Sequence, residues 1–185
     1  MKNVFLLLSI IVAMMIVAPA AYSQTTPAQE DAARVKIREQ LRALLAKVGP
    51  AVKVSFRQSE KQPFNFVGSL REGLTNAESF EIVISVTKNE TLGFRVYPHY
   101  QGAYINVDKV RNGVGLMRQL LRFTDRTFFF WGADDTGDVF TGYTITLESG
   151  FPEEALKIVL RSVENMDKFV GELRPNIDGS QAPVK

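Results

Sequence analysis

The sequence predicts a single α+β domain in which helices pack on an antiparallel sheet of about five or six strands. Apolar residues recur at helical spacing near the N-terminus, in the middle and near the C-terminus, whereas residues 51–100 alternate in short β-like runs. The connections between these runs are too short for parallel crossovers, which need a dozen or more residues. A chain of 185 residues with 45% hydrophobic content is long enough to bury the core of such a domain.

Residues 1–23 have the pattern of an export signal that is removed from the mature protein. Lys2 provides a positive start, Val4–Val17 is an almost purely apolar run, and small residues follow. Cleavage after Ala20 or after Ser23 fits the preference of signal peptidase for small residues. An uncleaved membrane anchor is the alternative, although the apolar run is shorter than the ~20 residues that span a bilayer.

The mature chain is expected to form one domain over residues 24–177 with a flexible tail over 178–185, in the periplasm or outside the cell. The sequence has no Cys, which excludes disulfides, thiol nucleophiles and cysteine-ligated metals. One His leaves little for a histidine metal site, and a net charge of +2 excludes a strongly basic nucleic-acid binder. We therefore expect no cofactor, no metal, no nucleic acid and no membrane span after signal removal.

The first helix is predicted to begin with Thr26 as N-cap and Pro27 at the first helical position. Its buried stripe is expected to consist of Ile37, Leu41, Leu44, Leu45 and Val48. Gly49 and Pro50 have the pattern of a C-terminal stop, a glycine followed by a residue that cannot continue the helix.

Four strands are predicted after this helix, at Val52–Phe56, Phe64–Leu70, Phe80–Thr87 and Leu92–Tyr97. The third strand should direct Phe80, Ile82, Ile84 and Val86 to one face. Pro98 is expected to close the fourth strand, because proline cannot donate to a sheet ladder.

A second helix is predicted with Asp108 as its cap and a buried side formed by Val110, Val114, Met117 and Leu121. Gly113 and Gly115 weaken this helix by about 1 kcal/mol each. They indicate either a frayed first turn or a place where another backbone approaches closely, from this sheet or from a second subunit.

Residues 128–148 predict a β-hairpin whose turn determines its register. Asp134-Asp135-Thr136-Gly137 fits a type I turn with Gly137 left-handed. With Asp134 opposite Asp138, the expected pairs include Ala133–Val139, Gly132–Phe140, Trp131–Thr141, Phe130–Gly142, Phe129–Tyr143 and Phe128–Thr144. Opposed residues share a face. Phe129 and Trp131 thus belong to the core, whereas the second face is either half-covered by a terminal helix or an interaction surface.

The last helix is predicted to start at Pro152 and to end at Arg174-Pro175. Its apolar stripe has helical spacing and consists of Leu156, Val159, Leu160, Val163, Met166, Val170 and Leu173.

Acidic residues and the single histidine are the first candidates for chemistry. Asp134, Asp135 and Asp138 form a tight carboxylate cluster, but they do not match the spacing of a calcium loop and fit turn chemistry. His99 has no serine elbow or orienting acid in the sequence to form a triad with it. A catalytic role of Asp134 and Asp138 is therefore only the alternative interpretation.

Two groups of residues predict an interaction surface. Arg111, Arg118 and Arg122 recur at helical spacing, which fits either an anion-binding patch or an ordinary solvated helix face. Phe128, Phe130 and Phe140 fall on the second face of the hairpin and could form an exposed apolar patch.

Five segments between residues 104 and 173 carry a family resemblance: Tyr104–Asp108, Phe129–Trp131, Asp135–Asp138, Glu153–Leu156 and Met166–Phe169. In this order they resemble the YbjN-like family, which has a fold like that of type III secretion chaperones. The resemblance implies a non-enzymatic regulatory or protein-binding module, with no catalytic residues to carry over.

The sequence thus predicts an exported protein-interaction module that binds other proteins or forms a homodimer. The alternative is a small exported enzyme or ligand-binding protein that uses the acidic hairpin.

Overall fold

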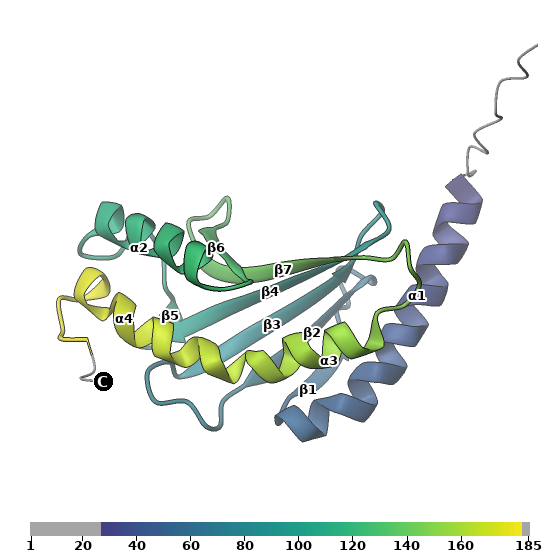
Figure 1. Ribbon diagram of the computed structural model, residues 1–185, viewed down its shortest axis with the longest axis horizontal. Helices are drawn as coiled ribbons and strands as arrows, with labels where there is room; N and C mark the ends of the chain where they lie inside the picture. The colour runs from purple at the N-terminus through teal and green to yellow at the C-terminus, as the bar shows by residue number, and fades with distance from the viewer. Residues whose placement is uncertain (1–26, 183–185) are drawn as a thin grey trace, which may run out of the picture.

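A computed structural model describes residues 27–182 of the chain (Figure 1). The helices are α1 (Pro27–Val48), α2 (Gly113–Arg126), α3 (Glu153–Ser162) and α4 (Asp167–Ile177), with short 3-10 helices η1 (Gly49–Val52) and η2 (Glu164–Met166). The strands are β1 (Ser55–Gln58), β2 (Asn65–Leu70), β3 (Ser79–Val86), β4 (Thr91–Tyr100), β5 (Ala103–Tyr104), β6 (Phe130–Ala133) and β7 (Val139–Thr146). The predicted N-cap Thr26 and residues 1–23 lie outside the described residues.

All strands belong to one antiparallel sheet of seven strands, which confirms the predicted α+β class. Six strands follow the order β1-β2-β3-β4-β7-β6, and the short β5 pairs with the end of β4. The β4–β7 pairing brings the C-terminal hairpin beside the four-strand meander, so the sheet is continuous across the whole domain.

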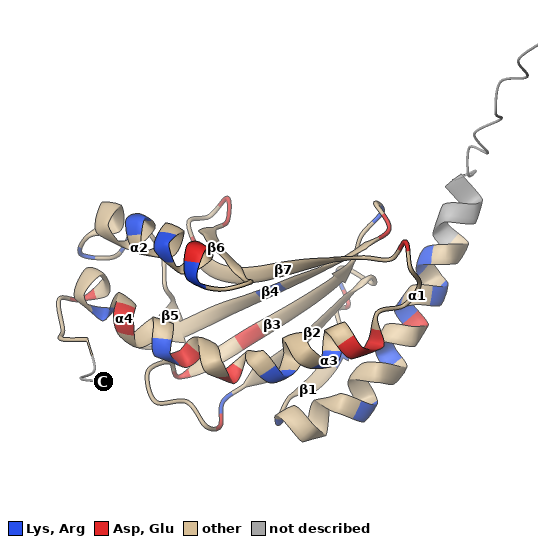
Figure 2. Cartoon of the chain, viewed as in Figure 1, with Lys and Arg blue, Asp and Glu red and all other residues tan. Residues whose placement is uncertain are grey.

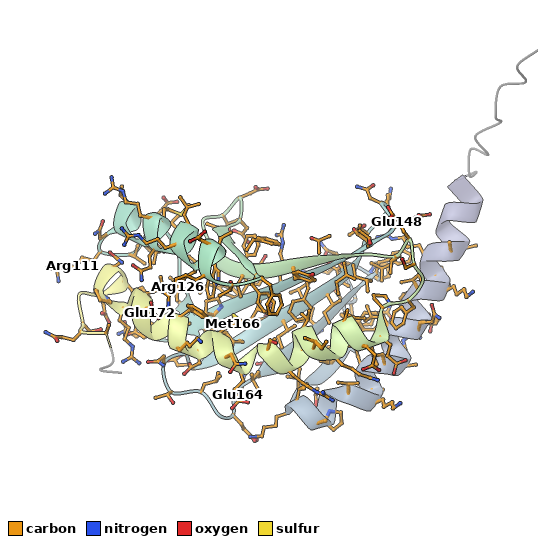
Figure 3. The ribbon with its side chains drawn as sticks, in the orientation of Figure 1. Arg111, Arg126, Glu148, Glu164, Met166 and Glu172 are labelled. Atoms are coloured by element: carbon orange, nitrogen blue, oxygen red, sulfur yellow. The ribbon has the colours of Figure 1, made fainter. Side chains whose placement is uncertain are left out.

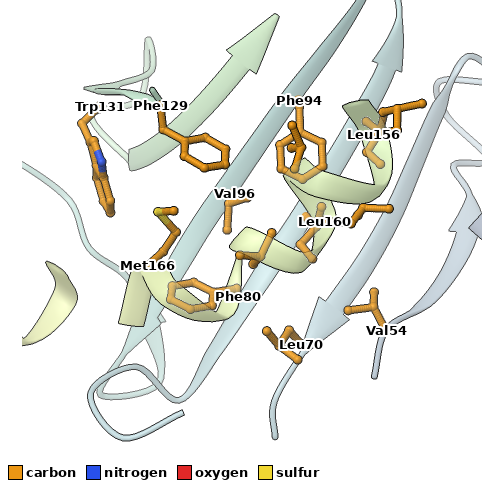
Figure 4. Close-up of a cluster of buried hydrophobic side chains, with 14 of the residues drawn as sticks. Val54, Leu70, Phe80, Phe94, Val96, Phe129, Trp131, Leu156, Leu160 and Met166 are labelled. Atoms are coloured by element: carbon orange, nitrogen blue, oxygen red, sulfur yellow. The ribbon is translucent and has the colours of Figure 1, made fainter. Parts of the chain in front are cut away.

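Within residues 27–182, the helices lie on one face of the sheet and leave the other face without a helix (Figure 1). In β3 the residues Phe80, Ile82, Ile84 and Val86 are buried as predicted, while the residues between them are half-buried. Figure 4 shows part of the core, in which Leu156, Leu160 and Met166 of the C-terminal helices lie over Phe80 and Phe94 of the sheet. Burial of this apolar surface is the dominant favourable contribution to folding.

The transition from α1 to β1 differs from the prediction. The predicted stripe of α1 packs in the core, with Leu41, Leu44, Leu45 and Val48 buried and Ile37 partly buried. Helix α1 ends at Val48, directly before Gly49 and Pro50 as predicted, but these two residues begin the turn η1, which is followed by Lys53 with φ of 57°. The left-handed Lys53 reverses the chain, so Val52 and Val54 pack on the core outside any strand and β1 begins only at Ser55.

The predicted end of the fourth strand at Pro98 is wrong, because β4 continues to Tyr100. The β4–β7 register ends at Val96, two residues before the proline. Beyond that point β4 pairs with β5, starting at His99 and Tyr104. Pro98 is therefore tolerated because it lies between the ladders with β7 and β5.

The predicted single C-terminal helix is bent. Helix α3 ends at Ser162, the 3-10 turn η2 follows, and α4 begins at Asp167. Every predicted stripe residue from Leu156 to Leu173 stays buried across the bend, since both segments lie along the helix-covered face (Figure 1). Pro175 does not end the helix, because α4 includes it and runs to Ile177.

The predicted hairpin register is confirmed for the four pairs from Phe130–Gly142 to Ala133–Val139. Gly137 has φ of 81°, and its N–H donates to the carbonyl of Asp134 at 2.9 Å, as the turn requires. Because opposed residues share a face, Trp131 and Thr141 lie on the buried side as expected.

Candidate functional site

Two surfaces of the described domain have side chains suited to binding. We call the first the α2 stripe, formed by the exposed apolar residues Val114, Met117 and Leu121. We call the second the open-face hollow, a depression of about 640 Å³ on the sheet face that no helix covers. The two surfaces are built by different elements.

The predicted buried side of the second helix is wrong. Helix α2 buries Leu116, Leu120 and Phe123, whereas Val114 and Leu121 are each 66% exposed and Met117 is 38% exposed. The sequence contains two apolar stripes at helical spacing on different sides of α2, and only one of them can face the core. The other remains on the surface as the α2 stripe.

The predicted cap of α2 is also corrected. Asn112 is the N-cap and accepts a hydrogen bond from the N–H of Gly115 at 2.9 Å, so Asp108 lies before the helix. A Cβ on Gly113 would lie 2.4 Å from the carbonyl oxygen of Val107, and one on Gly115 would meet Asn176 at the end of α4. The two glycines thus mark a close approach of neighbouring segments of this chain, rather than a frayed turn.

Helix α2 is fastened to α4 at both of its ends. At its start, the N–H groups of Arg111 and Asn112 donate to the carbonyls of Ile177 and Asn176. At its end, Arg126 forms an ion pair of 2.9 Å with Glu172, which Figure 3 shows between the two helices. These contacts join the helix that carries the α2 stripe to α4 at one end of the domain.

The three arginines predicted as one face do not form one face. Arg118 and Arg122 are exposed on α2 and flank the α2 stripe, and basic residues are visible along this helix in Figure 2. Arg111 precedes the helix and lies against Gly179, where an added Cβ would contact its guanidinium. The arginine surface is therefore reduced to Arg118 and Arg122.

The three phenylalanines are also divided between two faces. Phe130 is 39% exposed and contacts Phe140 on the uncovered side, but Phe140 itself is buried. Phe128 lies before β6 and is 56% exposed, with its ring edge-on to Tyr143 on the helix side. The alternation that predicted one patch fails because Phe128 is not part of the strand. A single apolar patch of Phe128, Phe130 and Phe140 is therefore not formed.

The open-face hollow combines polar, charged and aromatic side chains from four strands and the hairpin turn. Its lining consists of Gln62, Asn65, Glu81, Val83, Ser85, Thr87, Gly93, Arg95, Tyr97, Tyr104, Asp134 and Asp138. Most of these residues alternate with core residues along β2, β3 and β4, which places them on the uncovered face. Glu81, Arg95, Tyr97 and Tyr104 were not predicted as site residues from the sequence. The alternation of polar with apolar residues in these strands was the available signal.

The carboxylates of the acidic hairpin already accept hydrogen bonds from other groups of the domain. Asp134 Oδ1 accepts from the backbone N–H groups of Thr136 and Asp138, each at 3.0 Å, and from the Thr136 hydroxyl. Asp138 accepts from the amide of the buried Asn106 at 2.8 Å. Burial acts to raise the pKa of Asp134, but the hydrogen bonds from Thr136 and Asp138 outweigh it and lower the pKa. These carboxylates act in the turn, as its sequence predicted.

Tyr104 belongs to the aromatic side of the hollow, and His99 lies beside it. Burial, together with the charge of Glu81 and a hydrogen bond to it, raises the pKa of Tyr104 to about 12. The His99 ring lies 4.3 Å from the Tyr104 ring, centroid to centroid.

The described residues hold no group of three or more His, Cys, Asp or Glu side chains placed to bind a metal ion. Within the same part of the chain, every helix is too short or too polar to cross a membrane. No known protein-family model matches the chain, and no curated protein matches it either.

Proposed function

We propose that the chain is an exported, non-enzymatic protein-interaction module that forms a homodimer through the α2 stripe. The observation that carries this proposal is the exposure of Val114 and Leu121 on a helix that is rigidly fastened to the domain. Removing a Val, Leu or Met side chain from water contributes roughly 1.5–3 kcal/mol each. An ordered apolar stripe of this kind is typical of a surface that another protein covers.

The polar neighbours of the stripe suit a second copy of the same helix. Arg118 and Asp125 lie on the exposed side of α2, seven positions apart. If two copies of α2 pair antiparallel about an axis between residues 121 and 122, Arg118 of each copy comes opposite Asp125 of the other. A two-fold interface needs such self-complementarity. The charges would set the register, while the apolar stripe supplies most of the affinity.

Light scattering of the purified protein at several concentrations tests this proposal. We expect a dimer, and Leu121→Asp should convert it to a monomer because a carboxylate would be buried in the interface. Ile158→Asp is the matched control, since Ile158 is also an exposed apolar helix residue, 58% accessible, on α3. A wild-type monomer at every concentration, or an unchanged mass of the Leu121→Asp variant, would contradict the proposal.

The proposed cellular role follows from the export pattern and the resemblance to the YbjN-like family. Both support a regulatory or chaperone-like module in the periplasm or outside the cell that binds other proteins. The alternative of an enzyme or ligand-binding protein using Asp134 and Asp138 has less support, because both carboxylates already accept hydrogen bonds, from residues of the turn and, for Asp138, also from Asn106.

A further inference from the structure

The uncovered face of the sheet has a concentration of aromatic rings at the β4–β5 end. Tyr97 lies at the centre, with its ring centroid 5.8 Å from that of Tyr104 and 5.7 Å from that of Phe140. Tyr97 and Tyr104 line the open-face hollow. Aromatic faces carry partial negative charge and attract organic cations, above all guanidinium and ammonium groups.

One positively charged side chain of the domain, that of Arg95, already packs on this aromatic surface. The guanidinium carbon of Arg95 lies 4.5 Å from the centroid of Phe140, and an Arg95 nitrogen lies 3.3 Å from the hydroxyl of Tyr97. Arg95 contacts the ring of Phe140 and the hydroxyl of Tyr97, while Tyr97 and Tyr104 both line the hollow. The surface thus accepts a guanidinium group in the folded domain and has room for others.

The charge of the hollow favours a further cation. Glu81, Asp134 and Asp138 line it, and Arg95 is the only basic residue among its lining residues. Among the described residues, Arg95 forms no ion pair with any of the three carboxylates. The hollow therefore has an excess of negative charge in a protein whose overall charge is +2.

We propose that the open-face hollow binds the basic side chains of an extended polypeptide segment from a partner protein. The lysine or arginine side chains would lie over Tyr97 and Tyr104 and face Glu81. An extended segment fits better than a small free amine, because the hollow is partly open to solvent, whereas small-ligand sites enclose most of their ligand. Asn65 and Ser85 at the β2–β3 side offer hydrogen-bonding groups to its backbone. This inference goes beyond the proposed dimer and uses a different surface.

Binding of fluorescein-labelled hexalysine to the purified protein, followed by fluorescence anisotropy, tests the inference. We expect saturable binding that Glu81→Gln weakens about fivefold, the effect of removing one partly exposed charge partner. Glu148→Gln removes the same charge from an exposed residue outside the hollow and should leave the affinity unchanged. The near-ultraviolet circular dichroism of Trp131, which is buried in the core, checks that each variant is folded.

Aromatic variants and a competing amine distinguish this site from nonspecific attraction of a polycation. Tyr97→Ala should weaken binding about threefold, while Tyr97→Phe, which keeps the ring, should not. Leu121→Asp should leave the hexalysine affinity unchanged, so that failure of the dimer and failure of this site are distinguishable. Equal affinity of Glu81→Gln and wild type, absence of hexalysine binding, or equally tight binding of free spermidine would overturn the inference.

Discussion

The carboxylate of Asp167 accepts a hydrogen bond from the backbone N–H of Ala77 at 2.8 Å and thereby joins the first turn of α4 to the loop between β2 and β3. The same carboxylate also accepts from the N–H groups of Thr75 and Asn76 at 2.8–3.0 Å. Asp167 is 7% exposed, so these bonds are shielded from water. A single side chain therefore provides the acceptors for three consecutive backbone donors.

Replacing this carboxylate should destabilise the whole domain. Asp167→Ala leaves the three N–H groups without their acceptor, and we expect a loss of about 3 kcal/mol in the free energy of unfolding, measured by urea denaturation. Asp135→Ala is the control, because Asp135 is exposed at the hairpin tip and its loss should cost less than about 0.5 kcal/mol. Equal stability of the two variants would disprove the structural role of Asp167.

Replacing the side-chain amide of Asn106 by a carboxylate should also destabilise the domain. Its side-chain nitrogen donates to the carbonyl of Thr136 and to Asp138, each at 2.8 Å, while its oxygen accepts from the N–H of Asp108. Asn106→Asp keeps the shape but places an acceptor against two acceptors, so we expect a destabilisation of about 2–3 kcal/mol in thermal or urea unfolding. The same change at the exposed Asn89 should have little effect; a comparable loss there would contradict this role of Asn106.

Alanine substitution should have a large effect on stability at one glycine of the hairpin and a small effect at another. A Cβ on Gly142 would lie 2.8 Å from the backbone oxygen of Phe94 and 2.6 Å from the ring of Phe130, whereas one on Gly132 would make only an ordinary contact of 3.9 Å. Gly142→Ala should therefore destabilise the fold by about 1–3 kcal/mol. Gly132→Ala should change the midpoint of unfolding only slightly. A larger loss of stability in Gly132→Ala than in Gly142→Ala would contradict the close packing of β7 against β4.

Alkaline unfolding should depend on Tyr104. Its pKa is raised to about 12 in the folded domain. The ordinary value of about 10 applies to the unfolded chain. Its contribution is thus fully present below pH ~10 and is lost as the pH rises through the folded value, because only the unfolded state ionises readily in that window. Urea midpoints measured across this range should fall less in Tyr104→Phe than in wild type, while Tyr143→Phe should behave like wild type.

Export should remove the first segment of the chain. In an export-competent host, mass spectrometry of the periplasmic or secreted protein should find an N-terminus at Ala21 or Gln24, which correspond to the two expected cleavage positions. Leu8→Arg interrupts the apolar run and should leave the unprocessed chain in the cytoplasm. Lys61→Arg, a neutral change outside this segment, should be processed normally. Efficient processing of Leu8→Arg would contradict the signal assignment.

Local patterns in the sequence were sufficient for the fold class, the hairpin register and the core outside α2. Strand β3 can bury Phe80, Ile82, Ile84 and Val86 together only by turning that one face toward the helix layer. The turn around Gly137 sets the pairing of β6 with β7, because turn type and loop length determine register. These features depend on neighbours in the chain, which a sequence displays directly.

Only the tertiary structure decided which surfaces remain available for binding. Helix α2 has apolar residues on two sides, and the docking of α4 and β6 selected Leu116 and Leu120 for the core and left Leu121 exposed. The open-face hollow likewise brings Glu81 beside Tyr104 and Asp138, residues far apart in sequence. Periodicity reports that a face is apolar or polar. The partner that covers that face is set by long-range packing, which no local pattern contains.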